Sequence, residues 1–388
     1  MADLHSELRS NELSMAGLVG LTAGKTVVNM GLRWIPFFLP NLGRAFGAST
    51  AGLTTVLGIG EMAGLLTAAT GRQLDRGRER LIITAGMALV GASTVLAIVG
   101  TFVVFALSQF LLILGISLYT VGGHAYISRH VAFARRGRAI GIFEVSWALG
   151  LLVGAPVAAL LIEGISWRAP FIAVGLMSLV ACVLLIRIPE DPALVRHAPA
   201  SPRPTVQLDN NAWMAIGASA GIALAGLTTI VIAGTWMEDR LGISTGGIGA
   251  VAMGFGAVEL LSSSGSARFS DRFGKNRSTR VALLVLCGGL VVICAAQSSL
   301  LLGAMGLVLF FGGFEYAIVT SFSVVSEAMP AARGQVLSVN VATGTVARGV
   351  GSVSSGFLYE GFGIIGPAAL SVVGAVAGFA LLGRVRSE

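Results

Sequence analysis

The sequence predicts an all-α membrane protein, and three observations support that fold class. Charged residues make up 12% of the 388 residues and hydrophobic ones 55%, which leaves too few charges to cover the surface of a soluble protein. No Asp, Glu, Lys or Arg occurs from Leu81 to Ser128, a stretch long enough for two membrane crossings of about 20 residues each. Glycine is abundant, with 53 residues, as in helices that pack closely in lipid. We therefore expect a multi-pass bundle of transmembrane helices.

Twelve apolar runs follow one another along the chain, and each is an expected membrane span. In order they are 14–40, 50–70, 81–100, 103–127, 139–162, 169–188, 212–236, 246–267, 281–297, 300–327, 335–358 and 364–383. Gly100 marks the turn between the third and fourth spans, and Gln297–Ser299 separates the ninth from the tenth. The first 13 residues are polar and of mixed charge, so we expect no cleavable signal peptide.

Basic residues are distributed unequally between the two ends of these spans. Twenty of the 26 Lys and Arg lie in the tails and loops on the side of the N-terminus, whereas Arg44, Arg168 and Arg240 lie on the other side. Because short loops rich in Lys and Arg stay in the cytoplasm, both termini are predicted to be cytoplasmic, in a multi-pass protein of a bacterial inner membrane. The net charge of +7 then reflects topology, and we expect the lipid bilayer, not nucleic acid, as the partner of the surface.

The chain resembles itself when it is shifted by about 197 residues. Glu163-Gly164 then falls on Glu360-Gly361, for example. A repeat of this length predicts two pseudo-symmetric six-helix bundles, the N-terminal half at residues 1–189 and the C-terminal half at residues 212–388. Residues 190–211 between them are polar and contain four prolines, so we expect a cytoplasmic linker.

Seven ionisable side chains lie inside the expected spans, where each costs on the order of 2.5–3.5 kcal/mol near the bilayer centre. They are Lys25, Arg33, Glu61, Glu144, Glu259, Glu315 and Arg348. Lys25, Asn29 and Arg33 are spaced four residues apart on the first span. Asn340, Gly344 and Arg348 repeat that spacing on the eleventh. Lipid disfavours such polar stripes, so we expect them to face an aqueous cavity or a partner helix.

The intramembrane carboxylates are candidates for carrying protons, because a carboxylate without a full partner in lipid can take up a proton near neutral pH. In order of preference they are Glu61, Glu259, Glu315 and Glu144. The alternative is that these acids form fixed ion pairs with the intramembrane cations. His124, in the fourth span, could shuttle a proton, although a hydrogen-bonded structural histidine is the more common role.

The most charged segment of the chain is the loop GRQLDRGRER, which runs from Gly71 to Arg80 between the second and third spans. Two copies of one motif are formed by Gly71, Asp75 and Arg76 in this loop and by Asp271, Arg272, Gly274 and Lys275 in the loop after the eighth span. Together with the six-plus-six repeat, the motif resembles that of the major facilitator superfamily, and the resemblance covers essentially the whole chain. One departure is Gly77, which follows Arg76 directly, one residue earlier than in the family pattern.

The resemblance implies roles for these residues. In that family the Asp and Arg of the motif form a cytoplasmic latch against neighbouring helices, a role that falls here on Asp75, Arg76, Asp271 and Arg272. An ordinary basic loop that obeys the positive-inside rule is the alternative. The resemblance also implies that spans 3, 6, 9 and 12 form an outer, lipid-facing scaffold, and these spans have no charged residues in their interiors.

The fifth span carries a second partial match. Gly150, Gly154 and Pro156 resemble the glycine-proline motif of the family's drug/proton antiporters, the branch with 12 spans, although Ala155 separates the glycine from the proline. Glycines admit close helix packing, and proline bends a helix by removing one backbone hydrogen bond. We expect a kink that seals a cavity against proton leak, with simple helix packing as the alternative.

Aromatic residues and cysteines add two expectations. Four tryptophans near span ends are expected to anchor at the membrane interface: Trp34, Trp167, Trp213 and Trp236. Trp147 lies deeper and is the aromatic candidate for substrate contact. The three cysteines lie in apolar runs as packing residues, and no metal site or cofactor is expected.

These features together predict a secondary active transporter, and not an enzyme, that works as a monomer by alternating access. The preferred function is proton-coupled efflux of small amphipathic molecules or drugs, with the proton gradient as the energy source. The first alternative is proton-coupled or facilitated uptake of a small organic acid or sugar, which would be favoured if Lys25, Arg33 and Arg348 formed an unpaired anion site. A membrane-embedded enzyme or sensor is a remote alternative, because the sequence has neither metal-ligand spacing nor a phosphate-binding loop.

Overall fold

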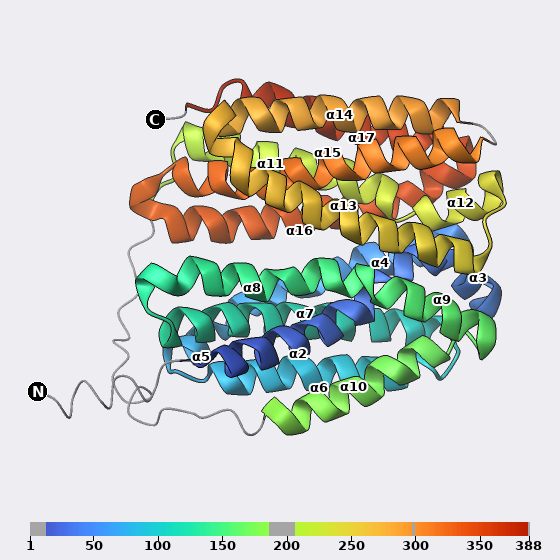
Figure 1. The fold of residues 1–388 in the computed structure, drawn as a ribbon, viewed down its shortest axis with the longest axis horizontal. Coiled ribbons are helices and arrows are strands. Elements are labelled where there is room, and N and C mark those ends of the chain that lie inside the picture. Colours follow the sequence, from blue (N-terminus) through green and yellow to red (C-terminus); the bar gives the residue numbers. More distant parts are fainter. Residues whose placement is uncertain (1–12, 186–205, 297–298, 387–388) are drawn as a thin grey trace, which may run out of the picture. The chain divides into compact units, whose positions relative to one another are not determined.

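The computed structural model describes residues 13–185, 206–296 and 299–386, and all regular secondary structure in these ranges is helical (Figure 1). Most of the expected linker, residues 190–205, lies outside the described residues. In the first half the helices are α2 (Met15–Arg33), η1 (Ile35–Phe38), α3 (Leu39–Phe46), α4 (Thr50–Glu61), η2 (Met62–Thr70), α5 (Gly71–Asp75), α6 (Glu79–Ala97), α7 (Phe102–His130), α8 (Phe133–Leu152), α9 (Gly154–Gly164) and α10 (Ala169–Leu185). In the second half they are α11 (Asn210–Ile230), α12 (Ala233–Leu241), α13 (Thr245–Phe273), α14 (Lys275–Ala295), α15 (Leu300–Glu327), η4 (Pro330–Ala332), α16 (Arg333–Phe362) and α17 (Ile365–Leu382).

The all-α membrane fold is confirmed, although the expected count of twelve spans is not reproduced exactly by length and composition. Within the described ranges, nine helices are long and apolar enough to cross a membrane, and Ala169–Leu185 is a shorter apolar helix. The remaining two expected spans correspond to α2 and α16. The helix α2 has 19 residues and α16 has 30. They are less apolar because they carry the two polar stripes.

Several spans are interrupted where the backbone cannot continue its hydrogen bonding. The first span breaks after Arg33, where Pro36 lacks the N–H that an α-helix needs. The chain continues as η1 and α3, and Pro40 lies in the first turn of α3, where proline is tolerated. The fifth span breaks at Val153 between α8 and α9, because Pro156 cannot donate to the carbonyl of the residue four positions before it. The helical hydrogen bonding of the fifth span is therefore interrupted close to the proline of the span-5 motif.

The described helices group into two compact units. Unit 1 comprises residues 1–34, 63–154 and 168–202, and unit 2 comprises residues 35–62, 155–167 and 203–388. Parts of the first, second and fifth spans thus belong to the same compact unit as the whole C-terminal half. The contact units and the sequence halves are different divisions of the chain.

The sequence repeat is visible in the neighbour pattern of the helices. In unit 1, α2 packs against α8 and α10, and α6 packs against α7 and α10. In unit 2, α11 packs against α16 and α17, and α14 packs against α15 and α17. Each helix of the second set is the repeat counterpart of one in the first. Close packing depends on glycine, since a Cβ on Gly86 of α6 would lie 2.7 Å from the carbonyl oxygen of Gly115 in α7.

The charge-free spans carry many of the exposed apolar side chains. Leu179 on α10 is 65% exposed, Val291 on α14 is 67% exposed, and Val95 and Val373 on α6 and α17 are similarly exposed. Side chains of this kind are satisfied by lipid. These four helices therefore have the surface that a lipid-facing scaffold requires.

The prediction for the tryptophans is wrong at two positions. Trp34 and Trp236 are each only 1% exposed, because they lie beside the interruptions of the first and seventh spans and pack into the protein. The Trp34 ring meets Phe171 edge to face, with 5.0 Å between ring centroids. Trp213 is 51% exposed, which agrees with an interfacial position.

Candidate functional site

A charged cluster joins three helices of unit 1. Lys25 of α2 donates from Nζ to Oε1 of Glu144 in α8, at 2.5 Å, and Nε2 of His124 in α7 lies 2.6 Å from the same oxygen. Lys25 is 2% exposed, whereas Glu144 and His124 are 42% and 40% exposed. A buried ammonium group is therefore bound to a carboxylate that an imidazole also contacts from a more open position. We call these three residues the α2/α7/α8 cluster.

Glycine allows α8 to approach α2 closely enough for this contact. A Cβ on Gly150 would lie 2.8 Å from the Cβ of Asn29, and one on Gly154 would lie 3.2 Å from Cγ of Met30. Asn29 is buried and donates from Nδ2 to Oγ of Ser146 at 3.2 Å. The span-5 glycines therefore position the helix that carries Glu144.

Aromatic rings complete the surroundings of the α2 stripe. The Nζ of Lys25 lies 4.2 Å from the centroid of the Phe143 ring, and the guanidinium carbon of Arg33 lies 4.3 Å from the Trp147 ring. Both distances are within the range of cation–π attraction. Trp147 is 37% exposed. Both cations of the first span thus lie against aromatic rings of α8.

A second ion pair lies within unit 2 and connects α4 with α16. Arg348 donates from Nε to Oε2 of Glu61 at 2.9 Å and from Nη2 to Oγ1 of Thr345 at 3.1 Å. The two helices touch near this pair, because a Cβ on Gly58 would lie 2.6 Å from the carbonyl oxygen of Gly349. Glu61 belongs to the N-terminal half and Arg348 to the C-terminal half, so the pair connects the two halves of the sequence.

The other two carboxylates lie on adjacent helices of unit 2. Glu259 of α13 is 1% exposed, and Glu315 of α15 is 6% exposed. Ser263, one turn after Glu259, donates to Oε1 of Glu315 at 3.1 Å. Asn340 and Gly344 of the α16 stripe are also buried. The structure therefore places these groups in the interior and not against lipid.

Both loop motifs contain a glycine with positive φ. Gly77 and Gly274 both have positive φ, at 73° and 83°, just before α6 and α14 begin. Gly77 is thus the counterpart of Gly274 in spite of its early position. In the first loop, Arg129 at the end of α7 pairs with Glu79 at 2.7 Å and donates to the carbonyl of Leu74 at 2.9 Å.

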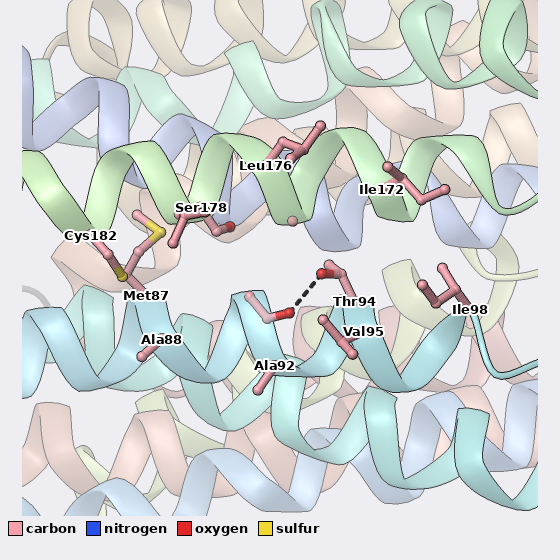
Figure 2. Close-up of a pocket in the computed structure, with 13 residues that line it drawn as sticks. Met87, Ala88, Ala92, Thr94, Val95, Ile98, Ile172, Leu176, Ser178 and Cys182 are labelled. Atoms are coloured by element: carbon pink, nitrogen blue, oxygen red, sulfur yellow. Dashed lines mark hydrogen bonds between the residues drawn. The ribbon is translucent and has the colours of Figure 1, made fainter.

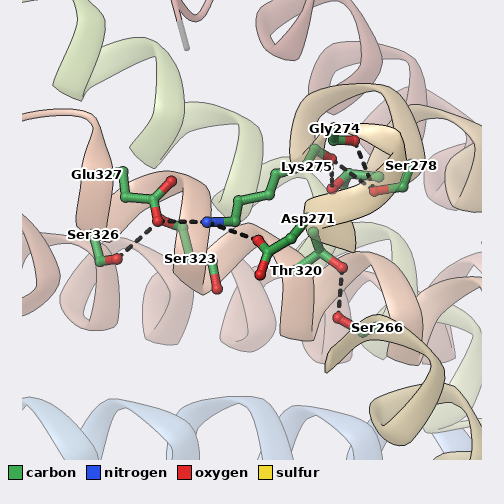
Figure 3. Close-up of polar contacts among 10 residues, drawn as sticks. Ser266, Asp271, Gly274, Lys275, Ser278, Thr320, Ser323, Ser326 and Glu327 are labelled. Carbon is green, nitrogen blue, oxygen red and sulfur yellow. Dashed lines mark hydrogen bonds and ion pairs between the residues drawn. The ribbon is translucent and has the colours of Figure 1, made fainter. Parts of the chain in front are cut away.

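The second loop is more exposed. Lys275 reaches Glu327 at 2.5 Å and Asp271 at 3.2 Å (Figure 3). The Arg272 guanidinium lies 5.7 Å from the Phe273 ring.

In the first loop, Gly71, Asp75 and Arg76 are exposed, and no ion pair joins Asp75 or Arg76 to another described residue of unit 1.

A groove between α6 and α10 lies apart from all these charges (Figure 2). Its volume is about 470 Å³, and its lining includes Met87, Val95, Leu176 and Cys182. Exposed apolar side chains of both helices, among them Val95 and Leu176, border the groove. The described residues contain no group of three His, Cys, Asp or Glu side chains placed to hold a metal ion.

Sequence reasoning identified the charged residues but missed some of their partners. Ser146, Thr345 and Phe143 were not singled out, because serine, threonine and phenylalanine are common in membrane helices. Their positions one turn or less from a candidate residue are the only local signal. The link between Lys25 and Glu144 crosses 119 residues and cannot be inferred from spacing.

Comparison with known proteins agrees with this architecture. Residues 21–352 match the Major Facilitator Superfamily profile. An MFS-type efflux pump of Mycolicibacterium smegmatis is 22% identical over 265 residues, which cover 66% of this chain and 61% of that protein. The uncharacterized MFS-type transporter YceJ of Bacillus subtilis is 23% identical over 230 residues, or 58% of each protein. The matched regions thus span about three fifths of the length of these relatives.

A solved structure shows the same fold. The crystal structure of a D-xylose-proton symporter aligns with a TM-score of 0.76 at 16% identity, covering 94% of this chain and 97% of that one. An alignment at this identity establishes the fold alone. Since the family profile covers most of the chain and the helices have the matching arrangement, this chain belongs to the Major Facilitator Superfamily.

Proposed function

We propose that this protein is a secondary active transporter that moves a small molecule across a bacterial inner membrane by alternating access. The family membership supports transport, and the ionisable groups inside the spans support a polar pathway. The protein works as a monomer, with both termini in the cytoplasm and the proton gradient as its energy source. The loop residues Asp75, Arg76, Asp271 and Arg272 act as the cytoplasmic latch.

The α2/α7/α8 cluster is the observation that best supports proton coupling. One oxygen of Glu144 contacts both Lys25 and His124. In this low-dielectric setting the buried ammonium needs its counter-ion, so a proton that neutralises Glu144 would leave Lys25 uncompensated. Protonation and helix rearrangement are therefore coupled. The half-exposed His124 supplies a route by which the proton reaches the carboxylate.

Efflux of small amphipathic molecules is the direction we favour. It is supported by the similarity to an MFS-type efflux pump and by the partial span-5 motif. Trp147, which is 37% exposed beside the Arg33 guanidinium, offers a flat apolar surface for such a molecule. Uptake of a small organic acid or sugar is less well supported, because Lys25 and Arg348 are each bound to a carboxylate.

The test uses purified protein in liposomes with an imposed proton gradient and ethidium as the amphipathic cation. Glu144→Gln should reduce gradient-driven flux at least about tenfold while ethidium binding changes little, because the charge that couples proton to helix movement is lost. Asp209→Asn is the matched control, since asparagine keeps the N-cap that Asp209 provides to α11. Flux of an organic anion in the same direction as protons, with no ethidium flux, would overturn the efflux proposal.

A second arm examines the buried acids of unit 2. Glu259→Gln should abolish gradient-driven flux more strongly than ligand binding if Glu259 lies on the proton path. Normal flux in this variant would remove Glu259 from that path.

A further inference from the structure

The outer end of unit 2, defined here as residues 35–61, 155–167, 233–249 and 351–364, brings segments of both sequence halves into contact. In Figure 1 the helices α3, α4, α9 and α12 gather at the right-hand end of this unit. Phe37 of η1 meets Gly234 of α12, where a Cβ would lie 2.0 Å from the Phe37 carbonyl oxygen. Any movement that separates the halves at this end must break such contacts.

Two glutamates bind across this contact in a reciprocal manner. Glu163, at the end of α9, accepts a hydrogen bond from the backbone N–H of Gly246 at 2.6 Å, in the first turn of α13. Glu360, near the end of α16, accepts one from the N–H of Ala51 at 2.8 Å, in the first turn of α4. Each glutamate thus belongs to one half of the sequence and binds a helix of the other half.

The two receiving helices begin with the same local sequence. α4 starts in Ser49-Thr50-Ala51-Gly52, and α13 starts in Ser244-Thr245-Gly246-Gly247. In each case the serine accepts from the N–H three residues later, at 3.1 Å and 3.2 Å. The serine leaves the preceding N–H of the first turn without a partner from its own helix. The glutamate from the other half satisfies that N–H.

Helix packing places each carboxylate at its receiving helix. A Cβ on Gly356 of α16 would lie 2.5 Å from Cα of Ala51, and one on Gly249 of α13 would lie 2.5 Å from Cβ of Ala159. Gly356 and Ala159 are one turn before Glu360 and Glu163, at repeat-equivalent positions. The close contact and the hydrogen bond therefore occur together in both copies.

The electrostatics favour this arrangement only while the two halves are in contact. Each glutamate lies in the last turns of its own helix, where the macrodipole disfavours negative charge. The same charge is favoured at the N-terminus of the receiving helix. Separation of the halves removes the favourable term and leaves the unfavourable one.

We propose that Glu163 and Glu360 are a pair of reciprocal latches that hold the outer end of the protein closed during the transport cycle. This inference rests on the proposed alternating access, since it names the contacts that must break when the outer end opens. Both residues are positioning residues and do not touch the substrate.

The test measures opening of the outer end directly, without substrate. Cys182, Cys287 and Cys294 are replaced by alanine, and Val353→Cys provides a reporter in α16 at the position where Val353 contacts Gly58 of α4. The full-length protein in lipid nanodiscs is treated with a charged, membrane-impermeant methanethiosulfonate reagent. The rate of modification reports how often water enters the contact.

Glu163→Gln and Glu360→Gln should each raise the modification rate, by about tenfold for loss of one charge-assisted hydrogen bond, and the double variant should exceed both. Glu163→Asp and Glu360→Asp, which keep the charge but shorten its reach, should act in the same direction. Asp239→Asn is the matched control. It weakens an outer contact with Tyr359 that lies within the C-terminal half and should leave the rate unchanged.

Unchanged rates in both the Gln and Asp variants would overturn the latch, as would an equal increase in the Asp239→Asn control. Size-exclusion profiles and thermal unfolding of each variant separate opening from misfolding. If the rates rise as expected but no ethidium flux is found in liposomes, the latch stands and the proposed substrate class fails.

Discussion

The first loop of the N-terminal half and its counterpart in the C-terminal half each contain an ion pair between two helix ends. The helices are repeat counterparts, but the acidic and basic residues have exchanged places. Glu79 at the start of α6 pairs with Arg129 at the end of α7, whereas Lys275 at the start of α14 pairs with Glu327 at the end of α15. The two positions are 196 and 198 residues apart, close to the repeat distance. The structure therefore conserves an ion pair between these helix ends, and not the sign of either residue.

The two pairs differ in burial, which changes what each contributes. The Glu79 side chain is 4% exposed and that of Arg129 is 26% exposed, while Glu327 is 51% exposed. Exposed ion pairs contribute little because water and salt screen them. Breaking a buried pair is costly because one charge is left without compensation. The ion pair between these helix ends should therefore contribute substantially to stability in the N-terminal half and little in the C-terminal half.

The largest expected effect comes from Arg129→Ala. This change leaves the Glu79 carboxylate buried without its cation and removes the donor to the Leu74 carbonyl, so the free energy of unfolding should fall by about 3–5 kcal/mol. Thermal unfolding of the purified protein in detergent, followed by tryptophan fluorescence, measures the change. A midpoint equal to that of the unmodified protein would contradict the structural role of the pair.

The next test exchanges the polarity. Glu79→Lys combined with Arg129→Glu gives the first pair the charge order of the second, so the double variant should be more stable than the two single changes predict, by at least about 1 kcal/mol. The double-mutant cycle uses the same unfolding assay. If the stability changes of the two single variants simply added up in the double variant, the first pair could not take the charge order of the second.

A smaller effect is expected at the two turns. Gly77→Ala should destabilise by about 1–2 kcal/mol, because alanine is strained at a φ of 73°. Gly274→Ala should cost at least as much, since the φ of 83° there accompanies a ψ of 126°, a region that is nearly restricted to glycine. Gly137→Ala is the control, because open space surrounds that position. Equal stability of all three variants would show that the positive φ of Gly77 and Gly274 does not require glycine.

The smallest effect is expected for Glu327→Gln. Lys275 keeps a second partner in Asp271 and the pair is exposed, so the loss should be about 0–1 kcal/mol and should shrink further at high salt. Unfolding midpoints at two salt concentrations measure it. A loss as large as that of Arg129→Ala would show that exposure does not separate the two pairs.

Much of the fold could be predicted because its signals are local. Runs of apolar residues reveal spans, Pro156 reveals where the fifth span breaks, and a charged residue within an apolar run reveals a polar environment. The burial of Trp34 and Trp236 could not be predicted in this way, because it depends on which helices pack beside the breaks. The partners of the charged residues in the candidate site could not be predicted for the same reason.

The sequence by itself determined the membrane-spanning class, the internal repeat and the set of intramembrane charges, since each follows from the cost of transferring residues into lipid. Only the tertiary structure decided the pairing: Lys25 with Glu144 across 119 residues and Arg348 with Glu61 across 287. It also decided that the repeated Glu163 and Glu360 reach helix ends in the opposite half. Charge–charge and hydrogen-bond contacts act over a few ångströms, and that proximity is created by helix packing and not by distance along the chain.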